Sequence, residues 1–370
     1  MIKKFFSIPL ILLIALIWTG SFFLAGYSEA RASDNDADDI REGVMAESGD
    51  FFSHCKSGIL YEAVTDTVLY AKNPDLPLIP ASMTKVMTAI ITLEHNPELE
   101  GELTVPDKAV SSYYTSWMDH PHLKAGETIS YYQCVEYMML PSANEAASAL
   151  AFTVCGGDRA SFVEEMNDKA KELGCENTCY IDPHGLSPSN RVSARDMSKI
   201  AQYAMSFPKL REILTHYEGV LKANELRKED IRYHSILMPM WPDDRYENPY
   251  SEYITGVKTG WITQSGYNYA LSMEKDGLEY YAVATGGDEE DCGDGSGRII
   301  QGDFRDMIEV LILTDGMTEE KLSSMAGSAG SRTPIIVLSI CFVLTVIILA
   351  VRAKMISSAG KAKDDPGSNN

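Results

Sequence analysis

The sequence predicts an α/β fold in which an antiparallel sheet is interrupted by a helical segment. Two observations indicate this arrangement. The turn-forming pairs Thr65-Asp66 and Asp276-Gly277 each lie between two short runs with strand character, one near each end of the domain. Between these hairpins, within 82–204, the middle of the chain is rich in helical patterns. We therefore expect an antiparallel sheet flanked by helices, with an inserted helical subdomain.

The first elements are expected directly after residue 50. Gly58–Glu62 and Thr67–Lys72 flank the pair Thr65-Asp66 and are predicted to form a β-hairpin. Pro80-Ala81 then leads into a helical pattern over Ser82–Leu93. The chain thus enters its first helix at a serine.

Further helices are expected in the middle of the domain, at 131–140, 144–154, 160–173 and 194–204. Pro141 separates the first two. The second hairpin pairs 267–274 with 278–285, and an amphipathic helix over 299–313 closes the domain. The acidic, glycine-rich segment 288–297 lacks the ligand spacing of a calcium loop, so it is expected to be solvated surface.

Apolar runs near the two ends of the chain are expected to direct the domain out of the cell. Lys3 and Lys4 precede an apolar run over 5–24, and Ala30-Arg31-Ala32 offers a cleavage site, so residues 1–32 are predicted to be a signal peptide. The alternative is an anchor that stays attached. A second apolar run, 334–351, is long enough to span a bilayer.

Basic residues follow the second apolar run and place the tail in the cytoplasm. The expected order of segments after the signal peptide is an acidic linker at 33–49, the folded domain at 50–315, a linker at 316–333, a transmembrane helix at 334–351 and a basic cytoplasmic tail at 352–370. After signal cleavage the chain is expected to cross the cell membrane once, with the folded domain outside the cytoplasm.

Charge and cysteine usage exclude two kinds of ligand. The net charge is −21, and the segment 33–331 is more negative still, because eight of the 32 Lys and Arg residues but only three of the 53 acidic residues lie outside it. This charge repels nucleic acid. Six of the seven cysteines lie outside the second apolar run and permit disulfides without specifying them. Cys175 and Cys179 resemble half a metal site, but no second pair has ligand spacing, so no metal is expected.

Three short motifs carry the chemistry, in the order Ser82-Met83-Thr84-Lys85, Ser142-Ala143-Asn144 and Lys258-Thr259-Gly260. Residues i and i+3 of a helix share a face, so Lys85 can reach the Ser82 hydroxyl. The helix N-terminus also brings backbone N–H groups close to the reacting oxygen. The same Ser-x-x-Lys pattern occurs at 53–56, before a predicted strand, and at 272–275, within one; in a strand residues i and i+3 point to opposite faces.

Each motif also has an ordinary structural alternative. Ser82 is then a helix cap, Lys85 a solvated lysine, Asn144 the cap of a helix that begins at Glu145, and Lys258-Thr259-Gly260 a turn at a strand end. The order and spacing of the motifs, and their exported setting, favour an acyl-transfer site with a serine nucleophile, a lysine base and a substrate clamp. Gly260 is expected to let a ligand approach the strand edge closely.

The segments around these motifs resemble the low-molecular-mass penicillin-binding proteins that are D-alanyl-D-alanine carboxypeptidases, peptidase family S11. The resemblance covers about residues 50–315 and includes Pro80-Ala-Ser-Met-Thr-Lys-Val-Met-Thr, Met139-Leu-Pro-Ser-Ala-Asn-Glu-Ala-Ala, Pro183-His-Gly-Leu and Gly256-Val-Lys-Thr-Gly. It implies a fold like that of serine β-lactamases and DD-peptidases, at the bacterial cell membrane. Two positions depart from the family pattern: Glu145, where Asp is common, and the segment Ser193-Ala194-Arg195-Asp196.

The resemblance implies the catalytic roles. Ser82 attacks the peptide carbonyl between two D-alanines, and unprotonated Lys85 accepts the serine proton. The like charge of Lys258 helps to keep Lys85 neutral. Ser142 relays protons to the leaving D-alanine. Water then hydrolyses the acyl-enzyme, and neither a metal nor another cofactor is needed.

The resemblance also implies how substrate is held. Asn144 binds the substrate backbone, and Lys258 and Thr259 bind its terminal carboxylate beside Gly260. The backbone N–H groups of Ser82 and Trp261 form the oxyanion hole. The expected partners are peptidoglycan stem peptides, β-lactams as covalent inhibitors, and the membrane through the C-terminal helix, but no nucleic acid.

The expected function is therefore a serine-type D-alanyl-D-alanine carboxypeptidase that trims pentapeptide stems. Three alternatives stay open. One is a D,D-endopeptidase that cuts peptide crosslinks. A class A β-lactamase would need a glutamate, such as Glu164 or Glu176, to activate the deacylating water. The third is a non-catalytic sensor of β-lactams or cell-wall peptides.

Overall fold

A computed structural model describes residues 52–110, 122–216, 218–235, 253–291, 299–301 and 314. The predicted signal peptide, acidic linker, C-terminal linker, membrane run and tail lie outside these residues, as does the predicted helix from 302 onward. Every helix within the described part of the chain falls short of the length and apolarity that crossing a bilayer requires. The membrane assignment therefore stays a prediction.

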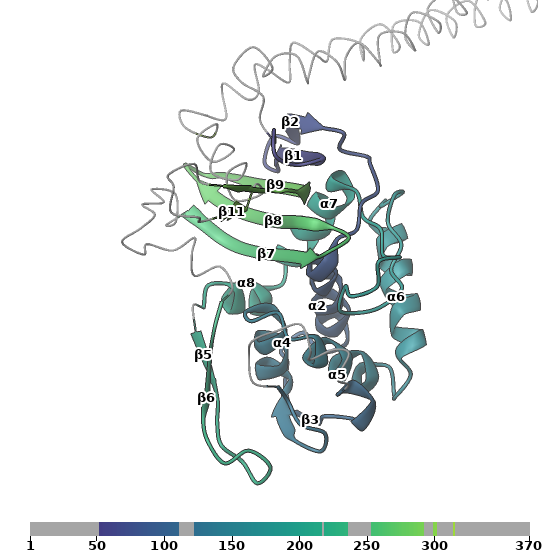
Figure 1. Cartoon of the computed structure of the whole chain (residues 1–370), viewed down its shortest axis with the longest axis vertical. Coiled ribbons are helices and arrows are strands. Elements are labelled where there is room, and N and C mark those ends of the chain that lie inside the picture. The colour runs from purple at the N-terminus through teal and green to yellow at the C-terminus, as the bar shows by residue number, and fades with distance from the viewer. Residues whose placement is uncertain are drawn as a thin grey trace, which may run out of the picture. The chain divides into compact units, whose positions relative to one another are not determined.

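A five-stranded antiparallel sheet joins the two ends of the domain, as expected, in the order β2-β1-β9-β8-β7 (Figure 1). Its strands are β1 (Ser57–Glu62), β2 (Thr67–Lys72), β7 (Ile254–Ile262), β8 (Gly266–Lys275) and β9 (Leu278–Gly287). β1 pairs with β9, with Ser57 opposite Thr285. This pairing leaves β7 at the edge of the sheet, where it packs beside the start of the first helix.

Both predicted hairpins are confirmed, and the turn residues explain them. Asp276 and Gly277 have φ angles of 54° and 80°. Positive φ at both central residues is what a type I′ turn requires, and its twist matches that of the flanking strands. Asp66, in the first hairpin, also has a positive φ of 53°. Local turn chemistry thus sets the register of both strand pairs.

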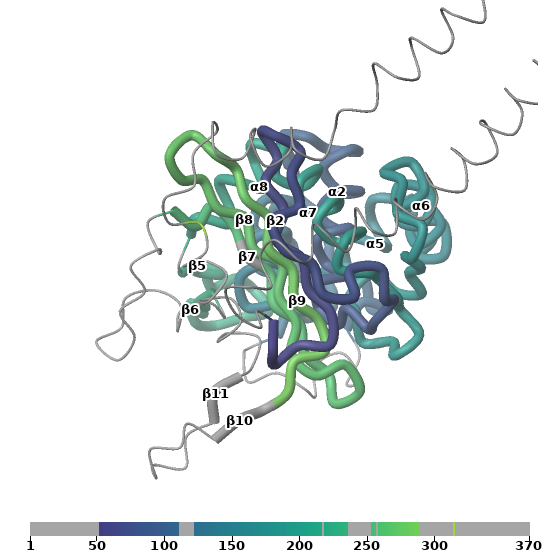
Figure 2. The backbone as a smooth tube through the Cα atoms, turned by 90° about the horizontal axis from the view of Figure 1, so that it is seen from above, coloured from purple at the N-terminus to yellow at the C-terminus, as the bar shows by residue number. Residues whose placement is uncertain are grey.

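The helices form layers on the sheet (Figures 1 and 2). They are α2 (Thr84–His95), α4 (Tyr131–Met139), α5 (Asn144–Val154), α6 (Arg159–Glu172), α7 (Ala194–Met205) and α8 (Pro208–Leu214). The first five confirm the predicted helices, and α8 was not predicted. α7 packs against β1, β8 and β9, α2 packs against α7 and α5, and α6 packs against both α2 and α5. The central helix α2 is buried over Thr84–Leu93, so its start is fixed by neighbours on every side.

Several short elements differ from the sequence-based expectation. The turns η1 (Ala81–Met83) and η2 (Asp107–Ala109) and two hairpins, β3 (Glu102–Thr104) with β4 (Thr128–Ser130) and β5 (Glu218–Leu221) with β6 (Ile231–His234), were not predicted. The strands β10 (Glu289–Asp291) and β11 (Ile299–Gln301) correct two predictions, a loop over the first and a helix over the second. They pair antiparallel, and the adjacent β-branched residues that begin β11 suit a strand.

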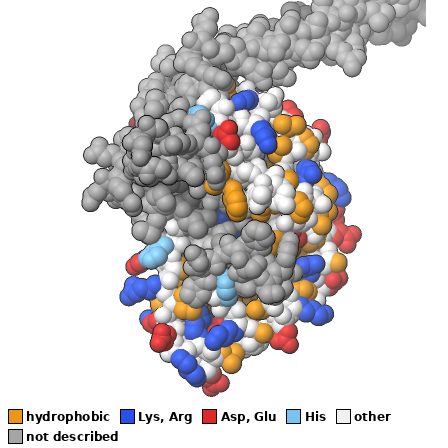
Figure 3. All heavy atoms as spheres, viewed as in Figure 1, with side chains coloured by type: hydrophobic (Ala, Val, Ile, Leu, Met, Phe, Trp, Pro, Cys, Tyr) orange, Lys and Arg blue, Asp and Glu red, His pale blue; other side chains and the backbone are white. Residues whose placement is uncertain are grey.

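The described surface is mixed in charge. On the face shown in Figure 3, acidic and basic side chains lie interspersed over the described part, with apolar side chains between them. The chain as a whole carries an excess of acid. The expectation that nucleic acid is not a partner therefore continues to rest on net charge.

Candidate active site

The first motif begins in a tight turn. Ser82 is the middle residue of η1, directly before α2. The preceding residue, Ala81, has a φ of 47°, a left-handed conformation that is uncommon for residues other than glycine. Two glycines close on this turn: a Cβ at Gly185 would overlap the carbonyl oxygen of Ala81, and a Cβ at Gly260 would lie 2.6 Å from the carbonyl oxygen of Pro80. The missing side chain of Gly260 thus makes room for the serine turn itself, while the expected approach of a ligand at this glycine stays a prediction.

Lys85 lies at the centre of the cluster. Its side chain is fully buried, and Nζ donates hydrogen bonds of 2.8 Å to Oγ of Ser82, Oδ1 of Asn144 and the carbonyl oxygen of His184. The structural alternatives for the first motif are therefore wrong. Lys85 is not solvated, and Ser82 makes no side-chain capping bond but accepts from Lys85.

Burial makes Lys85 a weaker base than an exposed lysine. Removal from water lowers its pKa to about 7, against an opposing effect of the carboxylates of Asp182 and Glu145. No carboxylate oxygen is among its hydrogen-bond acceptors. A substantial fraction of Lys85 is therefore unprotonated at neutral pH and can accept a proton from Ser82.

The second motif places its serine beside a second lysine. Ser142, which follows Pro141, has a left-handed φ of 66° and is buried. Nζ of Lys258 donates to Oγ of Ser142 at 2.9 Å and to the carbonyl oxygen of Thr259 at 2.9 Å. A conformation that costs energy is held here by the surrounding fold, as is common at functional sites.

Burial lowers the pKa of both lysines. Burial, followed by the positive charge of Lys85, lowers the pKa of Lys258 well below its ordinary value. Burial is also the largest cause of the lowered pKa of Lys85. The role expected of Lys258, to help keep Lys85 neutral, stays a prediction.

Asn144 belongs to the lysine network rather than to a helix cap. The N-cap of α5 is Ala143, which makes no side-chain capping bond, and Asn144 is the first residue of the helix. Its amide oxygen accepts the hydrogen bond from Lys85. The capping alternative for Asn144 is therefore wrong.

A buried aspartate holds the third acceptor of Lys85 in place, and sequence analysis gave it no role. The carboxylate of Asp182 accepts hydrogen bonds from the backbone N–H groups of His184, Gly185 and Ser187 at 3.0, 2.5 and 2.6 Å. The loop it folds turns the carbonyl oxygen of His184 toward Lys85. The signal was present in Asp182-Pro-His-Gly, since an aspartate side chain commonly binds the backbone that follows it in a turn.

The groups of this loop have defined charges. Burial disfavours the charge of Asp182, but His184 and the backbone N–H groups outweigh it and lower the pKa of the carboxyl. Burial lowers the pKa of His184 to about 4. At neutral pH the carboxylate is therefore ionised beside a neutral imidazole.

The third motif lies on the edge strand β7. The carbonyl oxygen of Thr259 accepts a hydrogen bond from Nζ of Lys258. Trp261 is 46% exposed, and the centre of its ring lies 6.1 Å from that of Tyr267. Buried Asn268 donates to the carbonyl oxygen of Gly260 at 3.0 Å and accepts from the N–H of Gly286 at 3.0 Å. Asn268 thus fixes the strand on which the motif sits, and sequence analysis did not identify it.

The glutamates considered for a β-lactamase lie apart from the buried cluster. Glu164 lies in α6 and Glu176 lies after that helix, and both are exposed. Exposed carboxylates at these places do not provide a base held against Ser82. The structure therefore favours the peptidase alternatives over the class A β-lactamase.

Comparisons with known proteins find a matching family model and similar chains. A family model described as D-alanyl-D-alanine carboxypeptidase, Peptidase S11, matches residues 45–289. The chain is 31% identical over 234 residues to the D-alanyl-D-alanine carboxypeptidase DacF of Bacillus subtilis, covering 62% of this chain and 57% of that protein. It is 35% identical over 156 residues to a D-alanyl-D-alanine endopeptidase of Pseudomonas aeruginosa, covering 42% and 49%. The chain thus spans about half the length of these curated relatives.

Solved structures show the same fold. The Streptomyces K15 DD-transpeptidase superposes with a TM-score of 0.60 at 24% identity, over 71% of this chain and 98% of that one. A D-alanyl-D-alanine carboxypeptidase of Mycobacterium tuberculosis superposes with a TM-score of 0.58 at 19% identity, over 71% and 92%. The expected fold class, an antiparallel sheet flanked by helices with an inserted helical subdomain, is confirmed.

Proposed function

Because the chain belongs to the S11 peptidase family of D-alanyl-D-alanine carboxypeptidases, we propose that it is a serine peptidase that removes the terminal D-alanine from peptidoglycan pentapeptide stems. The observation that carries the proposal is the contact of 2.8 Å between Nζ of Lys85 and Oγ of Ser82. A fully buried lysine with a pKa of about 7 at that distance is a suitable base for a serine nucleophile.

Acylation begins at this pair. Oγ of Ser82 attacks the carbonyl carbon of the D-Ala–D-Ala bond while neutral Lys85 takes the hydroxyl proton. The backbone N–H groups of Ser82 and Trp261 are the proposed donors to the oxyanion that forms. Asn144 and the carbonyl oxygen of His184 fix the Lys85 amine in the position from which it accepts the proton.

The substrate itself tunes the second lysine. A terminal carboxylate bound between Lys258 and Thr259 favours the positive charge of Lys258, because an opposite charge stabilises the protonated amine. Charged Lys258 in turn disfavours a proton on Lys85. Binding of a substrate with a free carboxylate therefore increases the unprotonated fraction of Lys85, which links recognition of the C-terminus to catalysis.

Departure of D-alanine needs a proton on its nitrogen. Ser142 accepts a hydrogen bond from Lys258 and is the proposed relay by which the proton that Lys85 took from Ser82 passes to the leaving amine, so that Lys85 is neutral again. Breaking of the C–N bond leaves an ester on Ser82 and releases D-alanine. Water then attacks the ester, its proton passes to the base, and Ser82 is regenerated. β-Lactams follow the same acylation and are expected to remain attached as covalent inhibitors.

We also propose that the enzyme is held at the outer face of the bacterial cell membrane by residues 334–351, after removal of residues 1–32. The apolar length of that run and the basic residues that follow it support this location. Fractionation of cells tests it. A spanning protein stays in the membrane in high salt or alkali and requires detergent, whereas release by either treatment would contradict the proposal.

The decisive experiment measures D-alanine release from a pentapeptide that ends in D-Ala-D-Ala, with the purified full chain in detergent and its Ser82→Ala variant. Release by the wild type alone supports both the activity and the nucleophile. A folded protein that binds penicillin covalently but releases no D-alanine would favour the endopeptidase. Absence of both reactions would favour the sensor.

A D,D-endopeptidase is the second candidate, because the relative from Pseudomonas aeruginosa, 35% identical over 156 residues, carries that name. The two activities share the acyl-enzyme and differ in the group that leaves. Incubation with crosslinked muropeptides separates them, since an endopeptidase produces monomers and a carboxypeptidase releases only D-alanine from pentapeptide ends.

A further inference from the structure

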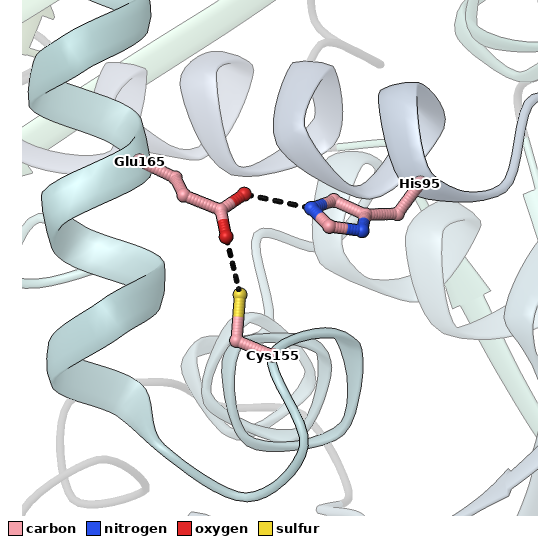
Figure 4. A group of neighbouring side chains, drawn as sticks. All are labelled: His95, Cys155 and Glu165. Carbon is pink, nitrogen blue, oxygen red and sulfur yellow. Dashed lines mark hydrogen bonds and ion pairs between the residues drawn. The ribbon is translucent and has the colours of Figure 1, made fainter.

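Three metal-ligating side chains meet outside the proposed active site, at the junction of three helices (Figure 4). His95 is the last residue of α2, Cys155 follows the last residue of α5, and Glu165 lies within α6. Their ligand atoms all lie within 4.8 Å of one another. We propose that His95, Cys155 and Glu165 bind a zinc ion.

The geometry brings the three side chains to one point. Oε2 of Glu165 lies 2.7 Å from Nε2 of His95, and Oε1 of Glu165 accepts a hydrogen bond of 3.3 Å from the thiol of Cys155. In Figure 4 the imidazole and the thiol both point at the carboxylate. A tetrahedral zinc ion holds N, O and S ligands roughly 3 to 4 Å apart, given metal–ligand distances of about 2.0 to 2.3 Å. The cluster therefore needs only small side-chain rotations to surround an ion.

The donor set selects the kind of metal. A thiolate and an imidazole favour zinc and similar transition metals, whereas calcium and magnesium prefer sites made of oxygen. Three protein ligands leave a fourth position for water. The side chains of His95 and Glu165 are 44% and 43% exposed, so an ion can enter from solvent.

The surroundings of the cluster favour a cation. The carboxylate of Glu165 accepts the hydrogen bond of the Cys155 thiol, and its negative charge attracts a divalent ion, which replaces the thiol proton when it binds. Lys169, one turn after Glu165 in α6, forms its ion pairs with Glu94 and Glu172.

An ion at this place would connect the helices that carry the active site. α2 carries Lys85 near its first turn and α5 begins with Asn144, while His95 and Cys155 lie at the other ends of these two helices. Zinc would tie both ends to α6 and stabilise their packing. The three residues are far apart in the sequence and show no ligand spacing, which is why the sequence analysis did not find them.

Cobalt is a suitable probe, because cobalt bound to a thiolate absorbs light in a charge-transfer band that zinc does not show. The full chain in detergent is freed of metal with a chelator and titrated with cobalt, then with zinc in competition with a chromogenic chelator. We compare the wild type with Cys155→Ser and His95→Gln. Cys179→Ser is the matched control, since it removes an exposed cysteine outside the cluster.

We expect one equivalent of cobalt with a thiolate band in the wild type and in Cys179→Ser, and no such band in Cys155→Ser. Loss of either ligand should weaken zinc binding by at least about tenfold, and zinc should raise the melting temperature of the wild type but not of Cys155→Ser. Circular dichroism confirms that each variant is folded. Absence of stoichiometric binding in the wild type, or binding unchanged in folded Cys155→Ser, would show that the cluster is only a hydrogen-bonded network.

Discussion

Nζ of Lys85 lies 2.8 Å from Oγ of Ser82 inside a protein interior that excludes water from the lysine side chain. The two residues are three apart in sequence. Ser82 is the middle residue of the 3-10 turn η1, and Lys85 lies in the first turn of α2. Their contact joins the proposed nucleophile to the proposed base, a lysine whose pKa burial has lowered to about 7. Four predictions follow from the way the fold maintains this pair.

Replacement of Lys85 by methionine should slow the reaction strongly while leaving the serine in place. General-base catalysis contributes about 10²- to 10⁴-fold to rate, so the rate constant for acylation by penicillin should fall by that range. The measurement is the time course of labelling with a fluorescent penicillin. Lys222→Met, at an exposed lysine after β5, is the matched control and should label at the wild-type rate. A folded Lys85→Met variant with undiminished labelling would contradict the assignment.

Acylation should depend on pH through Lys85. The reaction needs the unprotonated amine, and the pKa of Lys85 is about 7, so the rate should rise as pH increases through about 7 and then level off. The same lowered pKa makes stability depend on pH. Between about pH 7 and the ordinary value of 10.5, Lys85 of the unfolded chain binds a proton that the folded protein does not bind, so the free energy of unfolding increases with pH in this range. Acylation rate constants from pH 5 to 9 provide the check, and a profile that is flat down to the acid end would refute it.

Substitution of Asp182 by asparagine should shift that pH profile. The negative charge of Asp182 raises the pKa of Lys85 against the effect of burial, so its removal should move the rising part of the profile to lower pH. The variant should also unfold more easily, by about 1 to 3 kcal/mol, because the backbone N–H groups of the loop lose a charged acceptor.

The control for this variant is Asp75→Asn, which removes a carboxylate that is 55% exposed and pairs with Arg195. It should leave both the profile and the stability nearly unchanged. A profile that stays at the wild-type position in folded Asp182→Asn would show that the carboxylate does not act on Lys85.

Alanine at Gly185 should destabilise the protein more than alanine at a glycine with a similar positive φ angle. Gly185 and Gly277 have φ angles of 90° and 80°. A Cβ at Gly185 would overlap the backbone of Ala81, whereas a Cβ at Gly277 meets no atom within 4 Å. Gly277→Ala should cost about 1 to 2 kcal/mol for the left-handed conformation, and Gly185→Ala should add about 1 to 3 kcal/mol for the clash.

Urea unfolding measures the two free energies, and penicillin labelling reports the serine turn. Gly185→Ala should also slow acylation, because relief of the clash requires movement of the turn that holds Ser82. Equal effects of the two substitutions on stability and labelling would show that the turn does not depend on close contact with Gly185.

The secondary structure was largely predictable from local signals. Asp276-Gly277 specified its hairpin through the φ values that its turn requires, and helical patterns located α4 to α7 to within one or two residues. The short hairpins β3–β4 and β5–β6 were missed, because pairs of three or four residues carry too little periodicity to stand out. The helix predicted over 299–313 was wrong at residues 299–301, because these residues pair as a strand with 289–291, and such pairing depends on a partner elsewhere in the chain.

The residue types of the candidate site were also predictable, but their contacts were not. The three motifs specify two serines, two lysines and an asparagine. The sequence does not show that Asn144 turns toward Lys85 instead of capping α5, or that Asp182 holds His184 against the same lysine. These contacts join residues 59 and 99 positions apart, and local patterns carry no information on such pairs.

By itself the sequence determined the two hairpins of the main sheet, the five long helices, the order of the motifs and the i, i+3 relation of Ser82 to Lys85, because each depends on residues that are neighbours in the chain. Tertiary structure alone decided the properties that make the site reactive. Packing of α2 against other elements removes water from Lys85, and removal of water lowers its pKa. Close approach of Gly260 and Gly185 holds the serine turn. Burial and close contact depend on which distant segments the fold brings together, and no local pattern encodes them.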